Sequence, residues 1–200
     1  MKKLIVLLLL CLVKNTVVLA QLKLPEGYVI ANDVNDSALT LKADFNGDRI
    51  KDQFTIIEKE GNARMIALIS KGPKQFTTLT HPELEFFDCC STIAFEKNVL
   101  TLTSRGMRYF EYYKFRYNKK LLTFELIGFD TESFGNAIHD GAGTQSMNML
   151  TGTYEYSVYT AKDENDGTSK SDKRKVKVPK KYTLNNFNEA YTFLHTLKTE

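Results

Sequence analysis

Residues 44–52, Asp-Phe-Asn-Gly-Asp-Arg-Ile-Lys-Asp, have the residue types and spacing of a cation-binding loop. Oxygen-bearing side chains occupy its first, third, fifth and ninth positions, and the carbonyl of the seventh can join them. The candidate ligands are Asp44, Asn46, Asp48, Ile50 and Asp52. Hard oxygen ligands of this kind suit Ca²⁺, which accepts about six to eight of them in irregular geometry. Three clustered carboxylates repel one another without a cation, so we expect weak Ca²⁺ binding that tightens the loop.

The Asn-Gly dipeptide inside this segment is also a strong signal for a two-residue hairpin turn. That turn would set Lys42 directly opposite Lys51 and would place aspartates on the apolar face of the hairpin. A wider loop, between strands that end near Ala43 and resume near Gln53, avoids both conflicts. We therefore predict the wider loop. The alternative to a metal site is an acidic turn that only caps two strands.

The segment resembles the calcium loops of integrin-type FG-GAP and related VCBS repeats, in which Asp-x-Asn/Asp-x-Asp-Gly-x-x-Asp lies between two strands. The positions that match are Asp44, Asn46, Asp48 and Asp52, whereas Arg49 stands where the family usually has glycine. A wider resemblance covers most of the mature chain. It is to small exported bacterial proteins that join one such loop to an antiparallel sheet. The resemblance implies Ca²⁺ binding and carries no activity with it.

The first twenty residues are typical of a secretory signal peptide, with two early lysines, a short apolar run and Ala20 at the expected cleavage point. We therefore expect an exported protein, periplasmic or extracellular, with one globular domain over residues 21–200. Lipid attachment at Cys11 is an alternative, but the residue before a lipidated cysteine is normally small and here it is Leu10. No later segment is long and apolar enough to span a membrane.

Charge is balanced once the signal is removed. The formal charge of +3 comes from 27 basic and 24 acidic residues, and Lys2, Lys3 and Lys14 make up the whole excess. A near-neutral mature chain gives no reason to expect nucleic-acid binding. The run from Lys170 to Lys181 nevertheless holds seven basic residues and one acid. It either contacts an anionic partner or protects a sheet edge, and we favour the edge.

Strand patterns dominate the mature chain. Short β-branched and aromatic runs, joined by turn signals near Gly61 and Asn98, predict an antiparallel meander that forms one sheet or a sandwich. Apolar residues at helical spacing between 187 and 197 predict one C-terminal helix. We therefore expect a mainly β fold, with α+β as the alternative.

Two polar segments without periodicity, 130–145 and 161–172, are expected to be long loops. Between them the chain returns to strand patterns. Val176 and Val178 then indicate a short basic edge strand, and Pro179 suits the end of such a strand.

A candidate binding surface combines the aromatic strand 107–117 with the loop 130–145. Its residues are Tyr109, Tyr113, Tyr117, His139 and Asp140. Alternation places Tyr109, Tyr113, Phe115 and Tyr117 on one face of the strand and Phe110 and Tyr112 on the other. An exposed aromatic strip could stack on a sugar or a partner protein, whereas packing within the sheet is the commoner role of such rings.

Catalytic motifs are lacking in the sequence. It has no nucleophile elbow, no histidine pair at zinc spacing and no phosphate-binding glycine motif. A hydrolase with His139 as base and Cys89, Cys90 or Ser133 as nucleophile is an alternative that the spacing does not specify. The two adjacent cysteines either bond to each other, pair between molecules or stay buried as thiols.

These observations favour an exported, non-catalytic binding or accessory protein whose partner is an unidentified protein or glycan. An inhibitor of a secreted enzyme is the alternative from the same class. An exposed aromatic face would favour a binding module, and a surface with all of these rings buried would favour a structural accessory protein.

Overall fold

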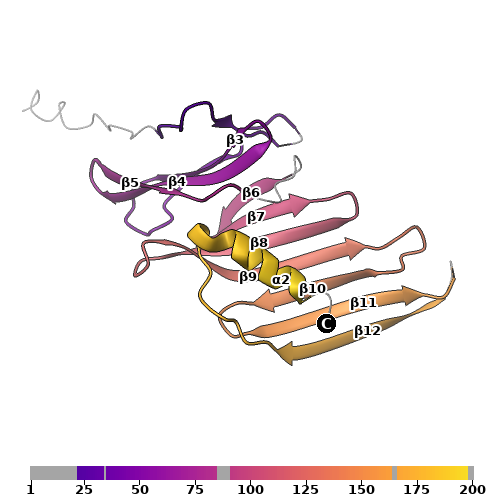
Figure 1. Cartoon of the computed structure of the whole chain (residues 1–200). Helices are drawn as coiled ribbons and strands as arrows, with labels where there is room; N and C mark the ends of the chain where they lie inside the picture. Colours follow the sequence, from indigo (N-terminus) through magenta and orange to yellow (C-terminus); the bar gives the residue numbers. More distant parts are fainter. Residues whose placement is uncertain (1–21, 34, 85–90, 164–165, 198–200) are drawn as a thin grey trace, which may run out of the picture.

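The computed structural model describes residues 22–33, 35–84, 91–163 and 166–197 (Figure 1). Within these residues the chain forms two antiparallel sheets and a C-terminal helix, and neither sheet closes into a barrel. The expected mainly β fold with a C-terminal helix is therefore confirmed. The signal segment, Cys11 and the Cys89-Cys90 pair lie outside the described residues, and their assignments stay predictions.

The smaller sheet has five strands in the order β1, β3, β4, β5, with β2 paired to β3. The bounds are β1 (Val29–Ile30), β2 (Thr40–Ala43), β3 (Asp52–Lys59), β4 (Asn62–Gly72) and β5 (Gln75–Thr80). Glu60 and Gly61 join β3 to β4 with φ values of 53° and 83°. Two successive positive φ values define the tight turn whose twist matches that of the flanking strands, as the turn signal predicted.

The larger sheet is a meander of seven strands, in which each strand pairs with the next one along the chain. The bounds are β6 (Thr92–Glu96), β7 (Val99–Arg105), β8 (Tyr109–Asn118), β9 (Thr123–Phe134), β10 (Ala142–Asn148), β11 (Thr153–Ala161) and β12 (Gly167–Lys175). β6 and β12 are its two edges (Figure 1). The predicted antiparallel meander is thus confirmed for this sheet.

The helix α2 (Phe187–Thr196) follows a short 3-10 turn, η2 (Leu184–Asn186), and lies across one face of the larger sheet (Figure 1). Phe187 anchors it, with ring centroids 4.9 Å from Tyr113 and 5.1 Å from Phe115. The same hydrophobic core continues to the smaller sheet, where the rings of Phe54 and Phe124 lie 5.7 Å apart. We call the face under α2 the inner face. No described element packs against the other, outer face.

The segment 130–145 is mostly sheet, so the expectation of a long loop there is wrong. β9 continues to Phe134 and β10 begins at its partner Ala142, which leaves only the turn 135–141. The misleading signal was polarity. Thr131 is buried on the inner face while Glu132 is exposed on the outer face, so a strand with one solvated face looked like a loop.

The predicted edge strand at residues 176–178 is also wrong, because no strand is assigned there and the edge is β12, which begins at Gly167. Most of β12 lies within the expected loop 161–172. All but two of its residues are exposed, so it carries no apolar alternation that could reveal it. Backbone pairing to β11 determines its conformation.

Candidate metal loop and outer sheet face

The candidate loop connects β2 and β3 at one end of the smaller sheet. β2 ends at Ala43, which pairs with Asp52 at the start of β3, and Leu41 pairs with Phe54. This register is the one expected for the wider loop, so the tight Asn-Gly hairpin is excluded. Four of the five predicted ligands therefore lie between the paired residues Ala43 and Asp52, and Asp52 itself is the fifth.

Asp44 organises the first half of the loop through backbone hydrogen bonds. Its Oδ1 accepts from the N–H groups of Gly47 (2.7 Å) and Asp48 (3.0 Å), and its Oδ2 accepts from that of Arg49 (2.8 Å). Gly47 and Arg49 have φ values of 77° and 69°. Arg49 thus adopts a left-handed conformation that glycine would adopt more readily, at the position where the resembling family usually has glycine.

Ser70, near the end of β4, joins the loop to the neighbouring strand and was not foreseen from the sequence. Its Oγ lies 2.5 Å from Oδ2 of Asp48 and 2.8 Å from Oδ1 of Asp52. A hydroxyl has one proton to donate, so Ser70 cannot donate a separate hydrogen bond to each carboxylate. The two carboxyl groups therefore share this hydroxyl, an arrangement that a proton on one of them or a cation between them would stabilise.

Asp52 is the buried member of this pair, with 1 % of its surface exposed. Its Oδ2 accepts from the N–H of Phe45 (2.9 Å) and its Oδ1 from the N–H of Ser70 (2.7 Å). Burial raises the pKa of Asp52 above its ordinary value, although these hydrogen bonds act against the rise. A proton shared between these two carboxyl groups is therefore held more readily on Asp52 than on Asp48.

Asp48 has the opposite character. Burial acts to raise its pKa, but hydrogen bonds from Ser70, Ile50 and Asn46 and the charge of Lys119 outweigh burial, and the pKa lies below its ordinary value. It also borders a basin of about 430 Å³, whose lining includes Lys119 and Tyr117. Asp48 is thus the charged, accessible carboxylate of the loop.

The fit of this site to a metal rests on Asn46, Asp48, Asp52 and the hydroxyl of Ser70. Asn46 accepts from the N–H of Asp48 (2.9 Å) and donates to the carbonyl of Ser70 (2.8 Å). Within the described residues no group of three or more acidic, histidine or cysteine side chains is placed to hold a metal ion. Asp44 instead uses both carboxylate oxygens on the loop backbone. The oxygen donors nevertheless have the chemistry that Ca²⁺ prefers.

The outer face of the larger sheet carries an aromatic cluster at the start of β8. The ring of Phe110 stacks on Tyr112 at a centroid distance of 6.2 Å and meets Phe134 edge-on at 5.6 Å. The guanidinium of Arg105 lies over Phe110 at 5.3 Å. Phe134 remains 43 % exposed. We call Arg105, Phe110, Tyr112 and Phe134 the aromatic cluster.

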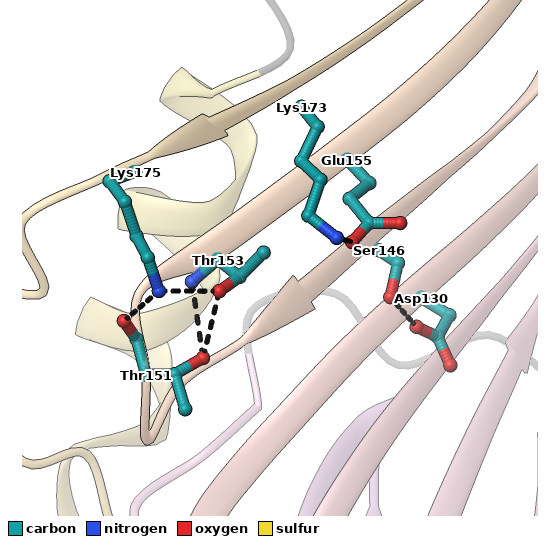
Figure 2. Close-up of polar contacts among 7 residues, drawn as sticks. All are labelled: Asp130, Ser146, Thr151, Thr153, Glu155, Lys173 and Lys175. Carbon is teal, nitrogen blue, oxygen red and sulfur yellow. Dashed lines mark hydrogen bonds and ion pairs between the residues drawn. The ribbon is translucent and has the colours of Figure 1, made fainter.

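Polar side chains also contact one another across neighbouring strands of this face. Figure 2 shows Ser146 donating to Asp130 (2.7 Å) and Lys173 paired with Glu155 (2.6 Å), each across neighbouring strands. Lys114 also forms an ion pair with Asp130. The outer face therefore combines hydroxyl and charged side chains with the rings of the aromatic cluster.

The predicted surface residues do not form one surface. Tyr113 is fully buried against Phe187, so its inclusion was wrong. Tyr109 is 43 % exposed, but Tyr117 lies eight residues further along β8, about 27 Å away at roughly 3.4 Å per residue. The predicted alternation of the strand is confirmed. The covered face is the one that carries Tyr113, because α2 packs there.

His139 and Asp140 lie in the turn 135–141 at the end of β9. Asp140 accepts from the N–H of Ala161 (3.0 Å), which ties this turn to β11. Ser133 accepts from the N–H of Gly135 (3.4 Å), and no hydrogen bond of the described residues joins it to His139. The turn therefore has a structural role in holding strand ends together.

Comparisons with known proteins add no assignment. No family model matches this sequence, and neither the curated proteins nor the solved structures contain a significant match. The described part of the chain has no helix of the length and apolarity needed to cross a membrane.

Proposed function

We propose that this chain is an exported, non-catalytic binding protein that holds a protein partner against the outer face of its larger sheet. The observation that supports this proposal is the aromatic cluster on a face that no described element covers. In the second part of the proposal, Ca²⁺ stabilises the loop 44–52 without taking part in any chemistry.

Aromatic rings beside an arginine are the side chains most enriched at the centres of protein interfaces. Phe134 and Phe110 present apolar area, and Arg105 is held in place by its contact with the Phe110 ring. Ion pairs such as Lys114–Asp130 flank the cluster and resemble a polar rim. The chain has no tryptophan, which makes a sugar-stacking platform the weaker interpretation.

Replacing Phe110 and Phe134 together with serine is expected to weaken partner binding by at least about tenfold, because two apolar anchors are lost. Immobilised wild-type and variant proteins would be compared for capture from the native extracellular or envelope fraction. Val29→Ser, which changes a residue that is 58 % exposed on the smaller sheet, is the matched control and should bind normally. Equal capture by all three proteins would contradict the proposal. Competition by free glycan would instead identify a sugar ligand.

Addition of Ca²⁺ is expected to raise the melting temperature. For a weak site with a dissociation constant of about 0.1–1 mM, 10 mM Ca²⁺ adds about 1.4–2.7 kcal/mol of stability, or about 3–10 °C. Asp48→Asn should abolish this rise, because it removes the accessible carboxylate while preserving the side-chain shape. Mg²⁺ is the control ion. A melting temperature that does not change when Ca²⁺ is added, or a rise that persists in the variant, would exclude this metal site.

A further inference from the structure

β12 leaves one long edge of the larger sheet open (Figure 1). It pairs with β11 from Ala161–Gly167 to Thr153–Lys175 without a bulge, and no other described strand pairs with it. The strand contains no proline. Natural proteins commonly protect such edges with bulges, prolines or short strands, and β12 uses none of these.

The outward backbone groups of β12 follow from its register. The N–H of Lys162 donates to the carbonyl of Asp166 (2.8 Å), and the N–H of Val176 donates to that of Gly152 (2.8 Å). Even-numbered residues therefore bond to β11 along the unbroken ladder between these two points. Odd-numbered residues direct their N–H and C=O groups away from the sheet; they are Gly167, Ser169, Ser171, Lys173 and Lys175.

Lys173 and Lys175, two of the three lysines of β12, do not shield this edge. Figure 2 shows Lys173 reaching back over the sheet to Glu155, while Lys175 donates to the carbonyl of Thr151 (3.1 Å) and to the hydroxyl of Thr153 (2.7 Å). Both charged groups are thus occupied on the outer face of β11. The remaining outward positions carry only glycine and serine, which leaves the backbone accessible to another strand.

We infer that β12 pairs with β12 of a second copy of this chain, antiparallel and centred on Ser171, so that the two larger sheets become continuous. In this register Ser171 faces Ser171 of the second copy, and Lys170 faces Asp172 of the second copy on both sides of the centre. The five outward residues of each strand then pair with one another and exchange about ten backbone hydrogen bonds.

Charge selects this register over its neighbours. A shift of the second strand by two residues sets Asp172 opposite its own copy in one direction, and Lys170 opposite its own copy in the other. Like charges directly opposite one another destabilise a strand pair, whereas opposite charges stabilise it. Shifts by one residue would match outward groups with inward ones. The pairing centred on Ser171 is the one without these conflicts.

The basic character of the strand is compatible with self-pairing because the antiparallel arrangement separates the charges. Three of its four basic residues are consecutive, at 173–175. In the pairing these three face the neutral residues 167–169 of the second copy. A two-fold contact of this kind uses the same surface on both copies and closes as a dimer.

Sedimentation equilibrium of the purified protein tests the inference directly. The average mass is expected to rise with concentration from that of one copy toward that of two. Ser171→Pro should weaken the association at least about tenfold, because it removes the central outward N–H groups. It should leave the fold intact, since proline is tolerated on an edge strand where the N–H faces away from its neighbour. The melting temperature of the variant checks this.

Charge reversal tests the register independently of folding. Lys170→Asp and Asp172→Lys should each reduce self-association, because each sets two like-charged pairs across the interface. An equimolar mixture of the two single variants should associate again, since every pair is then complementary. The double variant should also recover. A structural role of either residue within one copy predicts no recovery on mixing.

A wild-type protein that stays monomeric up to about 1 mM would overturn the inference. So would a dimer that Ser171→Pro leaves unchanged, or single variants that fail to recover when they are mixed. Capture of an extended acidic peptide at β12 by a monomeric protein would overturn it as well, and would identify a partner strand of another chain as the occupant.

Discussion

Asp52→Ala is expected to lower the free energy of unfolding by about 3–5 kcal/mol and the melting temperature by about 10–15 °C. The carboxylate accepts from the buried N–H groups of Phe45 and Ser70. It also contacts the hydroxyl of Ser70. Alanine leaves these donors buried without an acceptor, and each unsatisfied group costs about 1–3 kcal/mol. Thermal unfolding in the presence of a chelator measures this effect separately from any Ca²⁺ binding.

Asp33→Ala is the matched control for this prediction. Asp33 also accepts from two backbone N–H groups, those of Asn35 (2.8 Å) and Ser37 (2.9 Å), but in an exposed turn. Water replaces the carboxylate there, so a loss of about 1 kcal/mol or less is expected. Equal losses in the two variants would mean that Asp52 contributes only as a turn residue and does not stabilise the join between loop and β4.

Acidification is expected to destabilise the fold through His81. This residue is 1 % exposed; its Nδ1 donates to the carbonyl of Pro82, its Nε2 is buried without a partner among the described residues, and its ring packs near Phe187. Burial lowers the pKa of His81 from 6.5 to about 4. In the unfolded chain His81 therefore binds a proton below pH 6.5, whereas in the folded protein it binds one only below about pH 4.

This difference in proton binding makes the folded protein less stable as the pH falls. Stability is fully present above pH 6.5 and falls progressively toward pH 4, with a total loss of about 3 kcal/mol from this one group. Urea unfolding at a series of pH values measures the slope. His81→Asn keeps a donor for Pro82 but has no group that titrates in this range. Its slope between pH 6.5 and 4 should be shallower than that of the wild type, and an unchanged slope would show that other groups cause the acid loss.

Part of the fold could be read directly from the sequence. The alternation of β8 and the turn at Glu60-Gly61 are local patterns, and both were predicted as the structure has them. The strand β12 and the end of β9 were missed, because strands with a solvated face need no apolar residues there and resemble polar loops. Backbone pairing to a neighbour, which has no signature in composition, makes them strands.

The candidate metal loop also has one feature that the sequence predicted and one that it did not. The facing lysines at 42 and 51, together with aspartates on the apolar face, argued against a tight turn and predicted the wide loop. Both conflicts are visible in the sequence because register relates residues that are close in the chain. Ser70 was missed because it is eighteen residues from Asp52 and approaches it only when β3 pairs with β4. Its one visible signal was a hydroxyl that directly follows the apolar run of β4.

By itself, then, the sequence determined the antiparallel strands, the C-terminal helix and the width of the loop 44–52, because periodicity and charge register act between near neighbours. Only the tertiary structure decided which face of the larger sheet is covered, that Ser70 lies between Asp48 and Asp52, and that β12 is an open edge. Each of these depends on the packing of elements that are distant in the chain, and burial of that kind leaves no local pattern.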